Sequence, residues 1–179
     1  GSELVYSSYY GGRDTDECHS IDVLENQAYI CGHTASDDIS MVNAYQSSYA
    51  DTNESCDAYI CKVSSSGSAI IYSSYLGGAN TEECFSIKVN SLSEIHVVGN
   101  TISNNFPVLS AYQSSLEGTA KDMFLVRFGS TGSTIIYSTY IGGLGDDVAK
   151  SICCIGNMAY IVGYSDPNSA FPIYNAYQS

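Results

Sequence analysis

Two cysteines and two histidines form the densest group of soft metal ligands in the chain: Cys18, His19, Cys31 and His33. Thiolate sulfur and imidazole nitrogen are preferred ligands of zinc. We expect a hairpin here that pairs Val23 with Ala28. In that register Cys18 lies opposite His33, and Cys31 lies opposite Ser20 on the same face. The pattern leaves three states open, namely a zinc site, a disulfide, or unpaired thiols.

Three acidic side chains, Asp16, Glu82 and Asp147, occupy equivalent positions in turns that follow two glycines. Clustered oxygen ligands of this kind suit Ca²⁺, which makes the three residues candidate calcium ligands. None of the turns has the full spacing of an EF-hand or of a nonapeptide calcium repeat. We therefore expect the carboxylates mainly to accept hydrogen bonds from turn amides, with weak calcium binding as the alternative. No other cofactor is predicted.

The sequence carries no signature of an enzyme. The serines stand in no Gly-x-Ser-x-Gly elbow, and the three histidines, His19, His33 and His96, lie at three different phases of an internal repeat. Asp146 and Asp147 are adjacent, so their side chains are expected to diverge rather than to flank one glycosidic bond. We therefore predict a non-enzymatic protein.

The seven cysteines favour an oxidising compartment, and an odd number leaves at least one thiol free or paired with another chain. The disulfide candidates are Cys18, Cys31, Cys56, Cys61, Cys84, Cys153 and Cys154. Asn53 begins the only N-glycosylation sequon and falls in a long loop, where a glycan would be accessible. These features predict an extracellular protein, either secreted or at the cell surface.

The charge balance excludes several partners. Six Lys and Arg against 19 Asp and Glu give a formal net charge of −13, with no basic cluster to neutralise phosphates. Nucleic-acid binding and attraction to an anionic membrane are therefore not expected. No apolar run reaches the ~18 residues that a membrane-spanning helix needs, so membrane insertion is not predicted.

An internal repeat organises the chain. The segment YSSYLGG at residues 72–78 recurs as YSSYYGG at 6–12 and as YSTYIGG at 137–143, so the copies start 66 and 65 residues apart. We divide the chain into repeat 1 (1–66), repeat 2 (67–131) and a shorter repeat 3 (132–179). Each copy contains a pair of adjacent glycines, which predicts a positive φ or a close backbone approach. These glycines are Gly11, Gly12, Gly77, Gly78, Gly142 and Gly143.

Alternating apolar and polar residues, rich in β-branched and aromatic types, predict four short strands in each full copy and no helix. Every copy is expected to start with the Tyr-Ser strand, which could stack on a sugar or pack between sheets. The fold class is therefore all-β, with tandem four-stranded antiparallel sheets that resemble propeller blades. About 11 strands are expected, because repeat 3 stops before its last strand.

Several motifs in the same order resemble the SBBP β-propeller repeat family of large secreted and surface proteins. They are the YSTYIGGLGDD segment at 137–147, the AYIVG strand at 159–163, the Phe-Pro pair at 171–172 and the DAYICK strand at 57–62. The resemblance covers nearly the whole chain and implies the fold, but it implies no catalytic activity. Repeat 1 departs from the pattern at residues 39–42, where Phe-Pro is missing, and the cysteines are not part of it.

Fewer than three blades cannot close a propeller, which needs ~4–8. We expect the chain to continue beyond residue 1 or to meet another chain, because an open sheet edge is a template for a further strand. The favoured function is a structural or assembly module that self-associates head to tail, as a homo-oligomer or filament. The alternative is a ligand-binding module for glycans or adhesion, and a hydrolase on a propeller scaffold is the third hypothesis.

Overall fold

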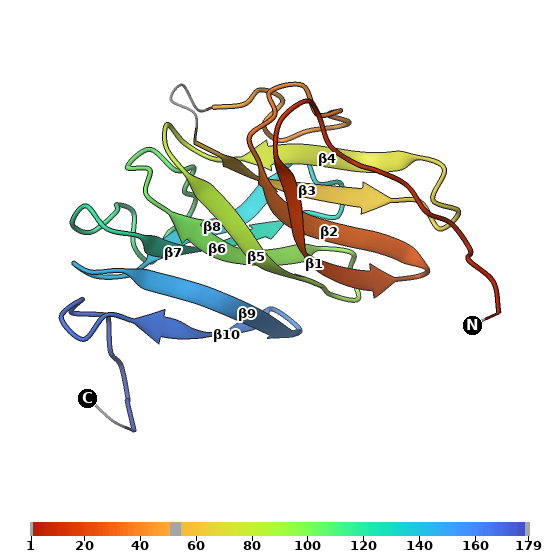
Figure 1. Cartoon of the computed structure of the whole chain (residues 1–179). Coiled ribbons are helices and arrows are strands. Elements are labelled where there is room, and N and C mark those ends of the chain that lie inside the picture. Colours follow the sequence, from red (N-terminus) through yellow and green to blue (C-terminus); the bar gives the residue numbers. More distant parts are fainter. Residues whose placement is uncertain (1, 51–54, 178–179) are drawn as a thin grey trace.

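The computed structural model describes residues 2–50 and 55–177, which form three antiparallel β-sheets and no helix (Figure 1). This architecture confirms the predicted all-β class with four-stranded, propeller-like units. In Figure 1 the sheets follow one another in chain order, from red through green to blue.

The first two sheets have four strands each, and the third has two. The first sheet contains β1 (Asp16–Leu24), β2 (Gln27–Thr34), β3 (Asp57–Val63) and β4 (Ile70–Leu76). The second contains β5 (Glu82–Val89), β6 (Ile95–Thr101), β7 (Asp122–Phe128) and β8 (Ile135–Ile141). The third contains β9 (Asp147–Ile155) and β10 (Met158–Ser165). Within each sheet, consecutive strands are neighbours, so the chain forms meanders.

The sheets are offset by one strand from the predicted repeats 1–66, 67–131 and 132–179. The Tyr-Ser strand does not begin a unit, because β4 pairs with β3 and β8 pairs with β7. A tight turn causes this pairing: the Gly67 amide donates to the Ser64 carbonyl at 2.9 Å, and Gly67 has a φ of 70° that favours glycine. A strand that leaves such a turn must pair with the strand that entered it.

Ten strands form in the described ranges instead of the predicted 11. The missing one is the first Tyr-Ser segment, whose residues Leu4, Val5 and Tyr9 are exposed. By analogy with β4 and β8, this segment would be the fourth strand of a sheet that precedes β1, and the described chain contains no such sheet. Without that sheet the segment has no backbone partner with which to form a ladder.

The sheets pack face to face through alternating side chains. The largest core cluster lies between the first and second sheets and contains Tyr29, Ile60, Ile87 and Phe124, all fully buried. A second interface joins the second sheet to the third through Val98 and Ile152. Because alternate residues of a strand point to opposite faces, the second sheet is buried on both sides.

The sequence left two explanations for the glycine pairs, a positive φ or a close backbone approach. The structure shows that the pairs permit close packing and do not adopt positive φ values. None of the six has a φ in the left-handed region. A Cβ on Gly77 would lie 2.2 Å from the Asp57 Oδ1 atom and 2.7 Å from the Glu82 Oε2 atom. A Cβ on Gly143 would lie 1.9 Å from the Ser169 carbonyl oxygen. The alternative hypothesis, close approach, is therefore confirmed.

In both four-stranded sheets, the long loop between the second and third strands covers the edge formed by the fourth strand. In the first sheet, loop residues Val42 and Gln46 form isolated bridges with Ser73 and Tyr75 of β4. Leu109 and Gln113 repeat the arrangement on β8. Covering an edge strand in this way removes a row of unpaired backbone groups. The opposite edges of the sheets are the first strands β1, β5 and β9, where the candidate site lies.

Candidate functional site

A one-residue β-bulge interrupts the first strand of every sheet. The register shifts between Cys18 and Ser20 in β1 and between Cys84 and Ser86 in β5, and β9 has the same irregularity between Ala149 and Ser151. A bulge re-aims the side chain of the extra residue and is frequent beside functional sites. The extra residues are His19, Phe85 and Lys150.

The bulge changes the predicted register of the first hairpin. Val23 does pair with Ala28, and Cys31 does lie opposite Ser20, as expected. Beyond the bulge, however, Cys18 lies opposite Gly32, while Glu17 lies opposite His33. The prediction that Cys18 faces His33 was therefore wrong, because the sequence pattern gave no sign of the inserted residue.

The three bulge residues stack across the sheets. The His19 ring lies parallel to the Phe85 ring, with centroids 5.2 Å apart and an interplanar angle of 3°. The Lys150 Nζ atom sits 5.1 Å from the centroid of the same Phe85 ring. This row fixes the orientation of His19, because one face of its ring is held against the second sheet.

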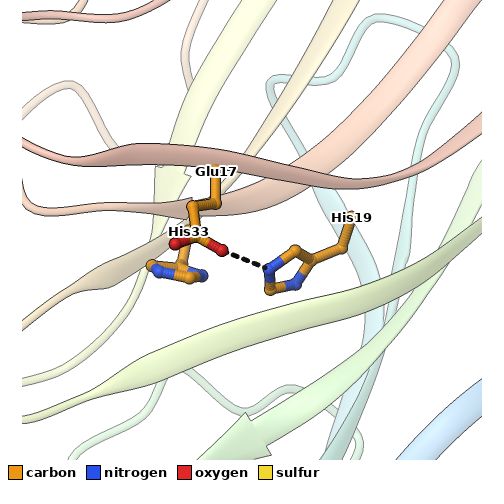
Figure 2. Close-up of side chains that lie close together, drawn as sticks. All are labelled: Glu17, His19 and His33. Atoms are coloured by element: carbon orange, nitrogen blue, oxygen red, sulfur yellow. Dashed lines mark hydrogen bonds and ion pairs between the residues drawn. The ribbon is translucent and has the colours of Figure 1, made fainter.

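Glu17, His19 and His33, which we call the bulge cluster, converge at the edge of the first sheet (Figure 2). One potential ligand atom from each lies within 4.8 Å of the others. The His19 Nε2 atom is 3.5 Å from the Glu17 Oε2 atom, and the two imidazole centroids are 4.9 Å apart. The histidines are half-buried and Glu17 is exposed, so the cluster is supported by protein on one side and open to solvent on the other.

A backbone contact determines the tautomer of His19. Its Nδ1 atom lies 3.1 Å from the carbonyl oxygen of Cys84 in the second sheet. A carbonyl can only accept, so Nδ1 carries the proton and Nε2 presents a lone pair toward Glu17 when the ring is neutral. Burial and the nearby His19 lower the pKa of His33, which favours its neutral form, and the His33 Nδ1 atom is buried without a hydrogen-bond partner.

The two cysteines of the predicted zinc site do not join this cluster. The Cys18 thiol donates to the Ser20 carbonyl at 3.8 Å. Cys31 is fully buried between the sheets, where burial and the neighbouring Cys84 thiol raise its pKa. A raised pKa disfavours the thiolate that zinc requires. Glu17, which sequence reasoning did not single out, takes their place beside the histidines.

The candidate calcium ligands are engaged in turn hydrogen bonds, as the preferred interpretation predicted. The carboxylate of Asp16 accepts from the Gly12 amide at 2.7 Å, that of Glu82 from the Gly78 amide at 2.6 Å, and that of Asp147 from the Gly143 amide at 2.7 Å. Each also accepts a hydroxyl hydrogen bond, from Thr34, Thr101 or Ser169. The weak calcium sites remain a prediction.

A second buried acid in each full sheet was missed. Asp122, at the start of β7, accepts from the Gln113 side-chain amide at 2.8 Å, while the Gln113 Oε1 atom accepts from the Gly142 amide at 3.0 Å. Asp57, Gln46 and Gly77 repeat this arrangement in the first sheet. The recurring Ala-Tyr-Gln-Ser landmark was the available signal, since its glutamine is the residue that links the loop to the sheet.

The remaining sequence candidates have structural positions. Tyr72 is buried between the first and second sheets, and Tyr75 is buried on the other face of the first sheet against the loop residue Tyr49. Neither side chain therefore offers a platform for a sugar. Asn53 lies outside the described residues.

No disulfide joins Cys18, Cys31, Cys61, Cys84, Cys153 or Cys154, and the Cys56 thiol donates to the Glu82 carbonyl at 3.7 Å. The predicted disulfides are therefore absent from this structure.

Both end sheets expose apolar side chains that the interior of the stack buries. Ile21 of β1 is 58% exposed, whereas the equivalent Ile87 and Ile152 are 0% and 2% exposed. At the other end, Val162 of β10 is 64% exposed, whereas the equivalent Cys31 and Val98 are both 0% exposed. We call the surface around Ile21 and Val23 the trailing face, and the surface around Ser151, Tyr160 and Val162 the leading face.

Comparison with known proteins adds no identity. No model of a known protein family matches the chain, and neither does any curated protein sequence. The resemblance to the SBBP repeats therefore stays a prediction from the motifs. In the described chain, no helix has the length and hydrophobicity that crossing a membrane requires.

Proposed function

We propose that this chain is a non-enzymatic assembly module whose sheets stack head to tail, and that a second copy of the same chain covers its open faces. The observation that carries the proposal is the repeated interface. Two repeat positions are buried wherever they lie inside the stack and exposed where they lie at an end. Ile21 represents the first position on the trailing face, and Val162 represents the second on the leading face. The leading face of one copy therefore exposes the same kind of apolar side chains that a trailing face covers inside the stack.

Hydrogen bonds between the sheets repeat with the same spacing as the sequence. The Ile87 amide donates to the Ser20 hydroxyl at 3.3 Å, and the Ile152 amide donates to the Ser86 hydroxyl at 3.3 Å. Ser151 is the next serine in this series and lies on the leading face. In the proposed contact, Ser151 accepts from the Ile21 amide of the next copy.

The two faces differ, so the contact is heterologous and does not close on itself as an isologous dimer would. Burying one Ile and one Val side chain contributes about 1.5–3 kcal/mol each, and the full interface also includes Tyr160 and the backbone of β10. Repetition of the contact yields a filament or a ring, according to the rotation between copies.

Two single variants test the proposal. Ile21→Asp should disable the trailing face and Val162→Asp the leading face, because each buries a charge in an apolar contact. Light scattering over a hundredfold dilution should show association for the parent chain and monomers for each variant. An equimolar mixture of the variants should form dimers and nothing larger, since each retains one intact face.

Leu92→Asp is the matched control, because Leu92 is an exposed apolar residue in the turn between β5 and β6, away from both faces. It should associate as the parent does. A parent chain that is monomeric at every concentration would overturn the proposal, and so would equal weakening by all three variants.

We also propose that the protein is extracellular. A count of free thiols in the native protein, after denaturation without reduction, tests this location.

A further inference from the structure

We propose that the bulge cluster, Glu17, His19 and His33, binds one divalent transition-metal ion, with Zn²⁺ as the preferred ion. Two imidazole nitrogens and one carboxylate oxygen are a donor set that suits zinc and related borderline ions. The inference is independent of the assembly proposal, because the cluster lies at the sheet edge and uses none of the residues that define the leading and trailing faces.

The spacing of the three groups is close to that of a coordination sphere. Zinc bonds of about 2.0–2.2 Å place two ligand atoms of a tetrahedral site roughly 3.3 Å apart. The His19 Nε2 atom and the Glu17 Oε2 atom are already 3.5 Å apart. The third ligand atom lies within 4.8 Å of both, and the exposed Glu17 side chain can move the remaining distance.

The hydrogen bonds around His19 are those that prepare an imidazole for a metal. Its Nδ1–H group donates to the Cys84 carbonyl at 3.1 Å, which directs the Nε2 lone pair at Glu17. Metal-binding histidines commonly donate their other ring nitrogen in this way. In the neutral ring, a lone pair and a carboxylate therefore face each other, and two acceptors at that distance require either a proton or a cation between them.

The residues around the bulge cluster hold the three proposed ligands in place. The stack on Phe85 restricts rotation of the His19 ring, and the hairpin register holds His33 opposite Glu17. Glu83 of the second sheet, whose charge also acts on His33, already pairs with Lys121 at 3.8 Å. The protein thus supplies three ligands and leaves the solvent side open for a water molecule or another small ligand.

The repeat itself provides the variants for a test. Phe85 and Asn100 occupy in the second sheet the positions of His19 and His33, so His19→Phe and His33→Asn replace ligands with residues that the same fold already accepts. Calorimetric titration with Zn²⁺ at pH 7.5 should show one ion per parent chain. Each of these variants, and Glu17→Gln, should weaken binding at least about tenfold. Loss of a residue that only orients a metal ligand already weakens metal binding by that amount, and here a ligand itself is lost. His96→Tyr is the control, because Tyr29 and Tyr160 occupy its equivalent positions, and it should bind as the parent does.

Co²⁺ gives a second readout that reports the ligand types. The parent should develop visible d–d absorption without the intense near-ultraviolet band of a thiolate ligand. Unchanged Zn²⁺ binding in the His19→Phe and His33→Asn double variant would overturn the proposal. A thiolate band, or no Zn²⁺ binding to the parent chain, would do the same.

Discussion

Buried carboxylates hold the turns that connect the sheets, and their ionisation is the most sensitive property at the scale of single residues. Glu82 is fully buried and accepts from the Gly78 amide and the Thr101 hydroxyl, with Asp57 nearby. Asp122 and Asp147 form the equivalent pair at the next turn, with Asp122 in the place of Asp57 and Asp147 in the place of Glu82. Burial is the main cause of the raised pKa values, to about 7 for Glu82 and about 6 for Asp122.

These pKa values predict that stability falls as the pH rises toward neutrality. Glu82 ionises near 4.5 in the unfolded chain and near 7 in the folded one, so between these values the folded state binds more protons. The free energy of unfolding should therefore decrease between about pH 4.5 and pH 7, by at most about 3 kcal/mol from this group. Urea denaturation at intervals across that range measures the change.

Glu82→Gln should reduce this slope, because the side chain no longer titrates, while Asp122 leaves a smaller residual slope up to about pH 6. Glu83→Gln is the matched control, since Glu83 is adjacent but partly exposed. Equal slopes in the parent and in Glu82→Gln would contradict the assignment.

At the scale of elements, a glutamine from each long loop connects the start of the third strand to the end of the fourth. Gln113 donates to the Asp122 carboxylate and the Ser115 carbonyl, and accepts from the Gly142 amide. The loop that covers β8 is therefore joined to β7 as well. This connection also provides a buried carboxylate with one of its few donors.

Gln113→Ala should lower the free energy of unfolding by about 1–3 kcal/mol, because it leaves the Gly142 amide and part of the Asp122 carboxylate without partners. Ser114→Ala, at the exposed neighbouring position, should change it by less than about 0.5 kcal/mol. Thermal and urea unfolding measure both variants. A Gln113→Ala variant as stable as Ser114→Ala would show that the loop is held by its backbone bridges alone.

At the scale of the whole molecule, apolar faces and net charge act against each other. The stack exposes Ile21 and Val162 at its two ends, which favours association, while the net charge of −13 makes copies repel one another. Screening by salt weakens the repulsion and leaves the apolar contact almost unchanged. The strength of self-association is therefore expected to depend on ionic strength.

Raising NaCl from about 10 mM to about 150 mM shortens the Debye length from ~30 Å to ~8 Å and should strengthen self-association several-fold. Sedimentation velocity at matched protein concentrations measures the shift toward larger species. Association that weakens with salt would indicate a contact made by opposite charges, which would contradict an interface built from the leading and trailing faces.

The sequence by itself determined the architecture because period-two patterning and a repeat of about 65 residues leave few alternatives to stacked four-stranded sheets. It also predicted that Asp16, Glu82 and Asp147 accept turn amides, since that interaction spans only four residues. Local chemistry of this kind is readable without a structure.

Only the tertiary structure decided the phase of the units and the membership of the site. The Tyr-Ser strand joins the sheet before it because the tight turn at Gly67 returns the chain onto β3. One bulge residue in β1 moves Glu17 opposite His33 and sends Cys18 away from it. A shift of one residue reverses which side chains share a face of the sheet. The residue types in the strand do not show at which position the bulge will form.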